Sequence, residues 1–136
     1  MGDYSRYTLI FLLNSKSEVI VVLAEFLLMI KNVHSAVVKI LRTNNGCEFF
    51  NSQVSSLLKC LGVVHQSFCV YTPQQNGVVE RRHRYILDTA RAIRFQASVP
   101  LRFCGDCVAN AVYLVNRFPS HTLHGKVTIE ILSKSS

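Results

Sequence analysis

The chain has 136 residues, of which 49% are hydrophobic and 17% are charged. This length is typical of a single domain, and the composition is that of a globular protein, which excludes an intrinsically disordered chain. The formal net charge is +7, from 15 basic and 8 acidic residues. Because such an excess of positive charge attracts polyanions, nucleic acid is the first partner class indicated and an acidic membrane surface the second.

The cysteines and the longest apolar run argue against two further classes. The five cysteines are an odd number and follow no secretory signal, so we expect reduced thiols and no disulfide framework. The most apolar run, Val19–Ile30, is too short to cross a bilayer and contains Glu25. We therefore expect neither a membrane partner nor a targeting segment.

The first predicted elements alternate between strand and helix. Tyr7–Leu13 is a short apolar run rich in β-forming residues, which predicts a buried strand. Ser15 and Glu18 have the spacing of a capping box, which predicts a helix running to about residue 32. Ala36–Leu41 predicts a second strand, and the polar residues that follow it are typical of a turn.

The alternation continues through the middle of the chain. A short helix is predicted over Ser52–Leu61, with Gly62 as its stop, and a third strand over Val63–Phe68. Tyr71–Gly77 has the composition of a loop, and a long helix is predicted over Val78–Phe95.

The last predicted helix begins near Pro100 and reaches about Asn116, and the tail beyond Pro119 is expected to be loose. The long helix before it should bury one face. The apolar residues that share this face at helical spacing are Val79, Ile86, Ala90 and Ile93. The order of strands and helices predicts an α/β layer fold in which the second and third strands are adjacent and parallel.

Two loops are candidates for function, because functional side chains in α/β sheets collect where strands end and helices begin. One follows the second strand and contains Asn44, and the other precedes the long helix and leads to Glu80. A purely structural role for Glu80 is also open, since an acid in the first turn complements the helix dipole and can pair with Arg84.

Several motifs in order resemble the integrase core of copia-type retrotransposon Pol polyproteins. The segments that carry this resemblance are Asp3–Tyr7, Thr43–Phe49, Thr72–Arg81, Leu87–Arg91 and Ala111–Arg117. The resemblance extends over nearly the whole chain. It implies a ribonuclease-H-like fold and DNA integration by polynucleotidyl transfer. In that chemistry two Mg²⁺ or Mn²⁺ ions held by three carboxylates activate the attacking hydroxyl and stabilise the leaving oxygen.

The resemblance places one of these three carboxylates in the chain. Glu80 matches the family's glutamate, whereas Asn44 stands where the family has its second aspartate, with the 35 residues 45–79 between them. The family's first aspartate lies on a strand upstream of the motif that contains Asp3, so we expect it to be absent here. Glu80 alone is insufficient to hold the metal ions, and we expect no stable metal binding and no strand transfer.

The resemblance also implies that the sheet is incomplete. We expect a mixed sheet flanked by helices, in which the first strand and most of the second are missing. We expect residues 1–119 to form a partial catalytic core and residues 120–136 to form a loosely ordered tail. The family's task would place the protein in the nucleus.

Between Glu80 and Arg102 the chain has six arginines and two acids, a local charge of +4. The resemblance implies that this helix lies along DNA and contacts phosphates without reading sequence. The residues expected to bind DNA are Gln75, Asn76, Gly77, Arg81, Arg84 and Arg91. The alternative is a solvated helix face with ion pairs from Asp88 to Arg84 and Arg91.

Two readings from other classes stay open. The first is a protein-interaction module that binds an intact integrase core or a second copy of the chain. The second is a thiol or zinc protein built on Cys104 and Cys107, a C-x-x-C pair near a helix start, with His121 and His124 as further zinc ligands. Neither predicts a small-molecule substrate.

Overall fold

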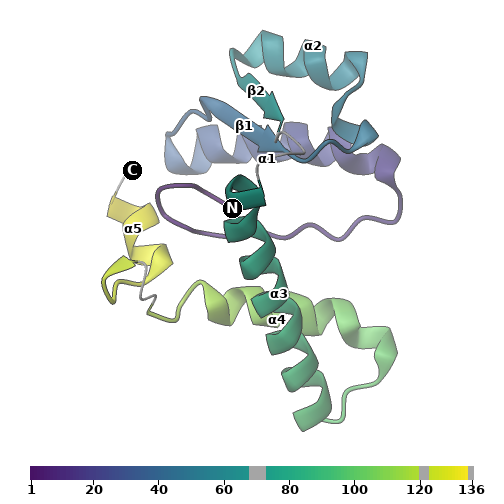
Figure 1. The fold of residues 1–136 in the computed structure, drawn as a ribbon, viewed down its shortest axis with the longest axis vertical. Helices are drawn as coiled ribbons and strands as arrows, with labels where there is room; N and C mark the ends of the chain where they lie inside the picture. Colours follow the sequence, from purple (N-terminus) through teal and green to yellow (C-terminus); the bar gives the residue numbers. More distant parts are fainter. Residues whose placement is uncertain (68–72, 120–122, 135–136) are drawn as a thin grey trace. The chain divides into compact units, whose positions relative to one another are not determined.

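The computed structural model describes residues 1–67, 73–119 and 123–134 (Figure 1). The helices and strands are α1 Val19–His34, β1 Ile40–Thr43, α2 Ser52–Leu61, β2 Val64–Ser67, α3 Pro73–Gln96, α4 Cys104–Val115 and α5 Thr128–Lys134. Short 3₁₀ turns are η1 Lys16–Glu18, η2 Cys47–Phe49 and η3 Leu101–Phe103. The chain forms two compact units: the strand unit is residues 13–76, and the helical unit joins residues 1–12 to the part from residue 77 onward.

The sheet of the strand unit is a parallel pair of β1 and β2, with Ile40 opposite Val64 and Thr43 opposite Ser67 (Figure 1). This confirms that the second and third predicted strands are adjacent and parallel. The first of them begins at Ile40 and not at residue 36, because α1 continues to His34 and ends in a left-handed Ser35. Residues 36–39 are therefore needed to connect the helix to the strand.

One apolar cluster holds the strand unit together. Leu23 and Leu27 of α1 pack with Val54 and Leu58 of α2 and with Val63, which precedes β2. The ends of α2 are as predicted. The Asn51 side chain accepts a hydrogen bond from the Val54 amide at 2.8 Å, and the helix stops where Gly62 adopts a φ of 67°, a conformation that glycine reaches without steric cost.

Tyr7–Leu13 is not a strand, so that prediction is wrong. Its large side chains from Ile10 to Leu13 are between 36% and 64% exposed. A strand needs a neighbouring backbone to complete its hydrogen bonds. The backbone N–H and C=O of Thr8 are instead bonded by the side-chain amide of Asn116, which is a contact at a single point.

The predicted capping box before α1 is also wrong. Ser15 makes no side-chain bond to the helix backbone, and its hydroxyl lies 2.6 Å from that of Ser17. The Glu18 carboxylate accepts a bond from the amide of Asn14 at 3.2 Å, one residue before the expected position. Ser15 precedes the 3₁₀ turn η1 and Glu18 ends it, so neither residue has the position in α1 that a capping box requires.

The long helix α3 begins at Pro73, five residues before the expected Val78. Proline is well suited to the first turn of a helix, because the N–H that it lacks has no acceptor there. The loop prediction is therefore wrong from residue 73 onward, whereas Tyr71 and Thr72 lie outside the described residues. Gln75, Asn76 and Gly77 belong to the helix, not to a mobile loop.

The core of the helical unit lies where α3 crosses α4 (Figure 1). Ile86 and Ala90 of α3 are buried, and Ile93 packs against the same cluster. Val79 is 44% exposed, so the predicted apolar face is confirmed apart from its first member. The buried residues contributed by α4 are Cys107, Ala111, Val112 and Val115.

The part of the chain after residue 122 contains α5 rather than the loose tail that composition suggested. Its first residue, Thr128, is fully buried and donates a hydrogen bond from Oγ1 to the backbone carbonyl of Asn116. This contact could not be foreseen from the polar composition of the segment. The division of the chain into a core and a tail at residue 119 stays a prediction. Across residues 1–67, 73–119 and 123–134, no helix has the length and hydropathy that crossing a bilayer requires.

Candidate functional site

Asn44 lies in the loop that leaves the carboxyl end of β1, as the sequence predicts. Its side chain is exposed, and its Oδ1 accepts a hydrogen bond from the Gly46 amide at 3.3 Å. This is the turn-forming contact for which asparagine is favoured in loops. The oxygen that could touch a cation is thus already oriented by the backbone of its own loop.

The loop is anchored at its base by a polar contact between the two strands. Thr43 is 7% exposed, and its hydroxyl lies 2.8 Å from Nε2 of His65 on β2. The His65 ring packs against Phe50, with 5.1 Å between the ring centroids. These contacts fix where β1 ends, and they therefore fix where the Asn44 side chain begins.

An open hollow of the strand unit surrounds Asn44. Its lining residues are Lys16, Ser17, Ile20, Asn44, Asn45, Gly46, Cys47, Glu48, Asn51, Ser52 and Gln53. Lys16 and Glu48 supply the charges of this lining, and Nζ of Lys16 lies 3.7 Å from the Glu48 carboxylate. The two charges cancel, so the hollow is polar and close to neutral.

Glu48 was not singled out from the sequence as a site residue. Its side chain is 19% exposed and packs so closely on Gly46 that a Cβ added there would lie 2.6 Å from a carboxylate oxygen. The sequence does place an acid four residues after Asn44, which could have marked Glu48 as a site residue. This spacing alone does not show that both side chains line one hollow. A Cβ at position 46 would therefore require the Glu48 carboxylate to move.

Glu80 lies on α3 in the helical unit, whereas Asn44 belongs to the strand unit, and each is placed within its own unit. The Glu80 side chain is exposed. Because α3 begins at Pro73, Glu80 lies past the first turn, so it does not sit at the positive end of the helix dipole. Within the described ranges, no group of three or more His, Cys, Asp or Glu residues could hold a metal ion.

The arginines expected to contact DNA are exposed on α3: Arg81, Arg84 and Arg91 all face solvent. The alternative to DNA binding is a solvated helix face with ion pairs from Asp88, and one of these pairs is present. The Arg91 guanidinium lies 3.1 Å from the Asp88 carboxylate. The two side chains are 68% and 59% exposed. An exposed pair of this kind contributes about 0–1 kcal/mol, so a phosphate can compete for the guanidinium.

Arg82 differs from its neighbours because it is partly buried. It donates from Nε to the Thr8 hydroxyl and from Nη2 to the Val115 carbonyl, both at 3.4 Å. Burial lowers the pKa of the Arg82 guanidinium, and the nearby Tyr85 opposes that shift. Arg82 therefore ties the first residues of the chain to α4 and is not displayed for a partner.

A buried amide completes this connection. Asn116 is 3% exposed, accepts from the Thr8 amide at 3.0 Å and donates to the Thr8 carbonyl at 2.7 Å. The two partners are 108 positions apart in the sequence. No local pattern could have indicated this pair, although a polar residue that ends an apolar helix is a weak signal of a buried role.

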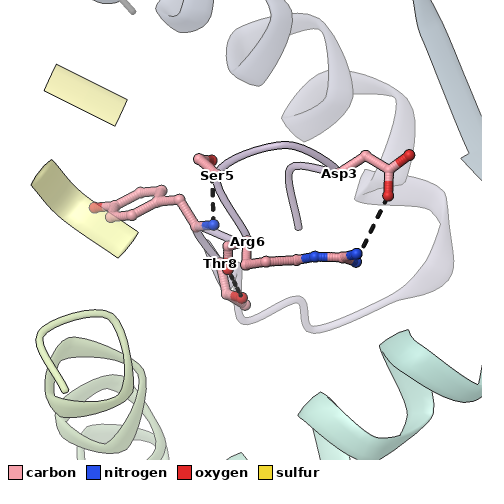
Figure 2. A network of polar contacts seen from close by, with 5 residues as sticks. Asp3, Ser5, Arg6 and Thr8 are labelled. Carbon is pink, nitrogen blue, oxygen red and sulfur yellow. Dashed lines mark hydrogen bonds and ion pairs between the residues drawn. The ribbon is translucent and has the colours of Figure 1, made fainter. Parts of the chain in front are cut away.

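Asp3 lies in a tight turn at the start of the helical unit, where its carboxylate pairs with Arg6 at 3.6 Å (Figure 2). Within the same turn the Tyr7 amide donates to the Ser5 hydroxyl at 3.2 Å, and the Thr8 hydroxyl lies 3.3 Å from the Arg6 carbonyl. The Asp3 side chain is 72% exposed. The ion pair with Arg6 lies within the turn itself.

The C-x-x-C pair occupies the first turn of α4. Cys104 is exposed, whereas Cys107 is 4% exposed and belongs to the core of the helical unit. Of the further zinc ligands considered, His124 is exposed and His121 lies outside the described residues.

Comparison with known proteins gives Pol polyproteins of plant transposons among the sequence relatives. The chain is 33% identical over 120 residues to the Pol polyprotein of transposon TNT 1-94 from Nicotiana tabacum, which covers 88% of this chain and 9% of that polyprotein. It is 31% identical over 123 residues to the Pol polyprotein of transposon RE1 from Arabidopsis thaliana, and this match covers 90% of this chain and 8% of that polyprotein. The chain thus spans less than a tenth of each of these relatives. No protein-family model matches it.

Solved structures give the fold. The catalytic core domain of BIV integrase superposes with a TM-score of 0.64 at 23% identity, covering 93% of this chain and 76% of that domain. The HTLV-2 integrase catalytic core domain, solved in complex with magnesium, has a TM-score of 0.60 at 16% identity. This match covers 80% of this chain and 66% of that domain. These likenesses confirm the predicted ribonuclease-H-like α/β fold. The chain is therefore related in sequence to a segment of copia-type retrotransposon Pol polyproteins and has the fold of retroviral integrase catalytic cores.

Proposed function

We propose that this integrase-derived chain binds DNA through the exposed arginines of α3 and does not itself catalyse strand transfer. The observation that carries the proposal is a difference in exposure among neighbouring arginines of α3. Arg81, Arg84 and Arg91 are exposed, whereas Arg82 is turned into the protein. Exposed guanidinium groups along one helix are suited to phosphate contacts that do not depend on sequence.

The lack of catalysis follows from the chemistry around Asn44. The family's reaction depends on divalent ions, and Mg²⁺ prefers hard, anionic oxygen ligands. Asn44 offers a neutral amide oxygen that already accepts a bond from Gly46. The acid beside it, Glu48, is paired with Lys16. Glu80 is the residue that would contribute a carboxylate to a bound Mg²⁺ or Mn²⁺, whereas Asn44 would contribute no charge.

Purified protein is expected to give no joined or nicked DNA in Mg²⁺ or Mn²⁺ buffer. The measurement is a strand-transfer and nicking assay with end-labelled oligonucleotides, run beside the Glu80→Gln variant. This variant keeps the size and polarity of the side chain and removes its charge. Equal background from both proteins is the expected result. Product formation that disappears in Glu80→Gln would show that the site is active and would contradict the proposal.

DNA affinity is expected to fall as salt increases, because binding to phosphates releases condensed counterions. Replacing Arg81, Arg84 and Arg91 together by glutamine should weaken binding about tenfold or more at low salt, and it should reduce the salt slope by about 0.9 for each phosphate contact removed. Fluorescence anisotropy with duplexes of unrelated sequence measures both quantities.

The matched control for this variant removes the same charge from the strand unit. Lys31, Lys39 and Lys59 are exposed there, and their joint replacement by glutamine lowers the net charge by the same three units. A small effect of this control is expected. An equal loss in both triple variants would show that total charge, and not the α3 surface, governs binding, and a salt-independent affinity would rule out phosphate contacts.

The alternative of a protein-interaction module rests on a different surface. Val21, Leu28 and Val33 of α1 are between 52% and 68% exposed, so their apolar side chains are accessible to a protein partner. An intact integrase core or a second copy of the chain is the partner that this alternative names. Nuclear residence belongs to the same proposal, since DNA is the partner that we infer.

A further inference from the structure

We propose that Cys104 and Cys107 are a thiol–disulfide modification site, in which a small-molecule disulfide oxidises the pair to an intrahelical bond. This inference does not depend on DNA binding. Its first support is the position of the pair, since Cys104 is the first residue of α4 and Cys107 follows within the same turn. Residues three apart on a helix share one face, and their Cβ atoms lie about 5–6 Å apart.

The first turn of a helix is also where the backbone can adapt. A disulfide requires its Cβ atoms to approach to about 3.5–4.5 Å, so the turn must tighten by about 1–2 Å. The first four N–H groups of a helix have no acceptor within it, and a small rearrangement there breaks few hydrogen bonds. η3, Leu101–Phe103, precedes α4 directly, so the backbone already changes its helical geometry at Cys104.

The environments of the two thiols differ in the way that a stepwise reaction needs. Cys104 is exposed and can meet a dissolved disulfide. Cys107 is 4% exposed and packs in the cluster that contains Ile86 and Ala111, which shields it from the same reagent. Cys104 is therefore suited to be the attacking thiol, because it is accessible to solvent. Cys107 is suited to be the resolving thiol, because it is shielded from solvent and lies beside Cys104 on the helix.

Gly105, one of the two residues between the cysteines, lies in close contact with the first residues of the chain. A Cβ at Gly105 would lie 2.8 Å from Cδ1 of Leu12, so the Leu12 side chain lies directly over this turn. Leu12 is 64% exposed, and its side chain can move aside without leaving a buried cavity. The contact at Gly105 therefore leaves the turn that carries the pair free to rearrange.

With oxidised glutathione as the oxidant, the reaction has two steps. The Cys104 thiolate attacks one sulfur of the reagent, which forms a mixed disulfide and releases one glutathione thiolate. The Cys107 thiolate then attacks Sγ of Cys104, forms the internal bond and releases the second glutathione. The protein loses two electrons and two protons, and one molecule of oxidised glutathione is reduced to two of the thiol.

The test uses the full chain in glutathione buffers of graded redox ratio, followed by acid quenching, alkylation and mass spectrometry. Trypsin cleaves after Arg102 and Arg117, and the peptide of residues 103–117 contains both thiols and no other cysteine. The expected product is this peptide lighter by two hydrogen atoms and without alkylation. Modification of the cysteines elsewhere does not affect this readout.

Two variants separate the steps. Cys107→Ala keeps a small apolar side chain in the core, and the glutathione adduct on Cys104 should accumulate at least about tenfold above the wild-type level, because nothing resolves it. Cys104→Ser alters an exposed side chain, and Cys107 should then remain an unmodified thiol. The second variant carries the test if the first does not fold. An unreactive pair, or equal adduct levels in the wild type and Cys107→Ala, would overturn the proposal.

Discussion

Replacing Asn116 by alanine is expected to lower the free energy of unfolding by about 2–4 kcal/mol, because it leaves two buried backbone groups without partners. The Asn116 amide bonds both the N–H and the C=O of Thr8, and Thr8 is 9% exposed. Each unsatisfied buried group costs about 1–3 kcal/mol. Urea unfolding followed by circular dichroism measures the loss.

The matched control is Asn110→Ala on the same helix. Asn110 is exposed, and its amide donates to the Asp106 carbonyl one turn earlier. Its replacement should change stability by no more than about 0.5 kcal/mol, as surface substitutions usually do. Similar losses in the two variants would show that the Thr8 contact contributes little, and that the first residues of the chain are held by Arg82 and the local turn instead.

Replacing Leu58 by alanine is expected to lower the free energy of unfolding by about 2–5 kcal/mol, the range for removal of a buried leucine side chain from a packed core. Leu58 is 2% exposed and lies beside Val54, which is fully buried, in the cluster that joins α1 to α2. The cost combines lost apolar burial with the cavity that remains. Urea unfolding again provides the measurement.

Leu28→Ala is the control for this substitution, because Leu28 belongs to α1 and is 52% exposed. Its loss should be well below that of Leu58→Ala. Amide hydrogen exchange adds spatial information. Leu58→Ala should reduce protection in the strand unit first, and Asn116→Ala should do so in the helical unit. A uniform loss of protection from either variant would show that the two units unfold as one.

The elements that the sequence determined are those whose cause is local. The apolar spacing of Ile86, Ala90 and Ile93 fixes the buried face of α3, and Gly62 ends α2 because it adopts a positive φ without steric cost. The strand–helix–strand order fixes the parallel pairing of β1 and β2, since the helix between them allows that connection. The motifs were sufficient to predict the family and its fold.

The tertiary structure alone decided whether an apolar segment forms a strand and which arginine of a run is buried. Tyr7–Leu13 has the composition of a strand, but strand formation requires a neighbouring backbone, and the contact made here comes from the side chain of Asn116. Adjacent arginines look alike in the sequence, yet Arg82 is turned toward Val115 while Arg81 remains exposed. Partners far apart along the chain determine both outcomes, and a local pattern carries no information about them.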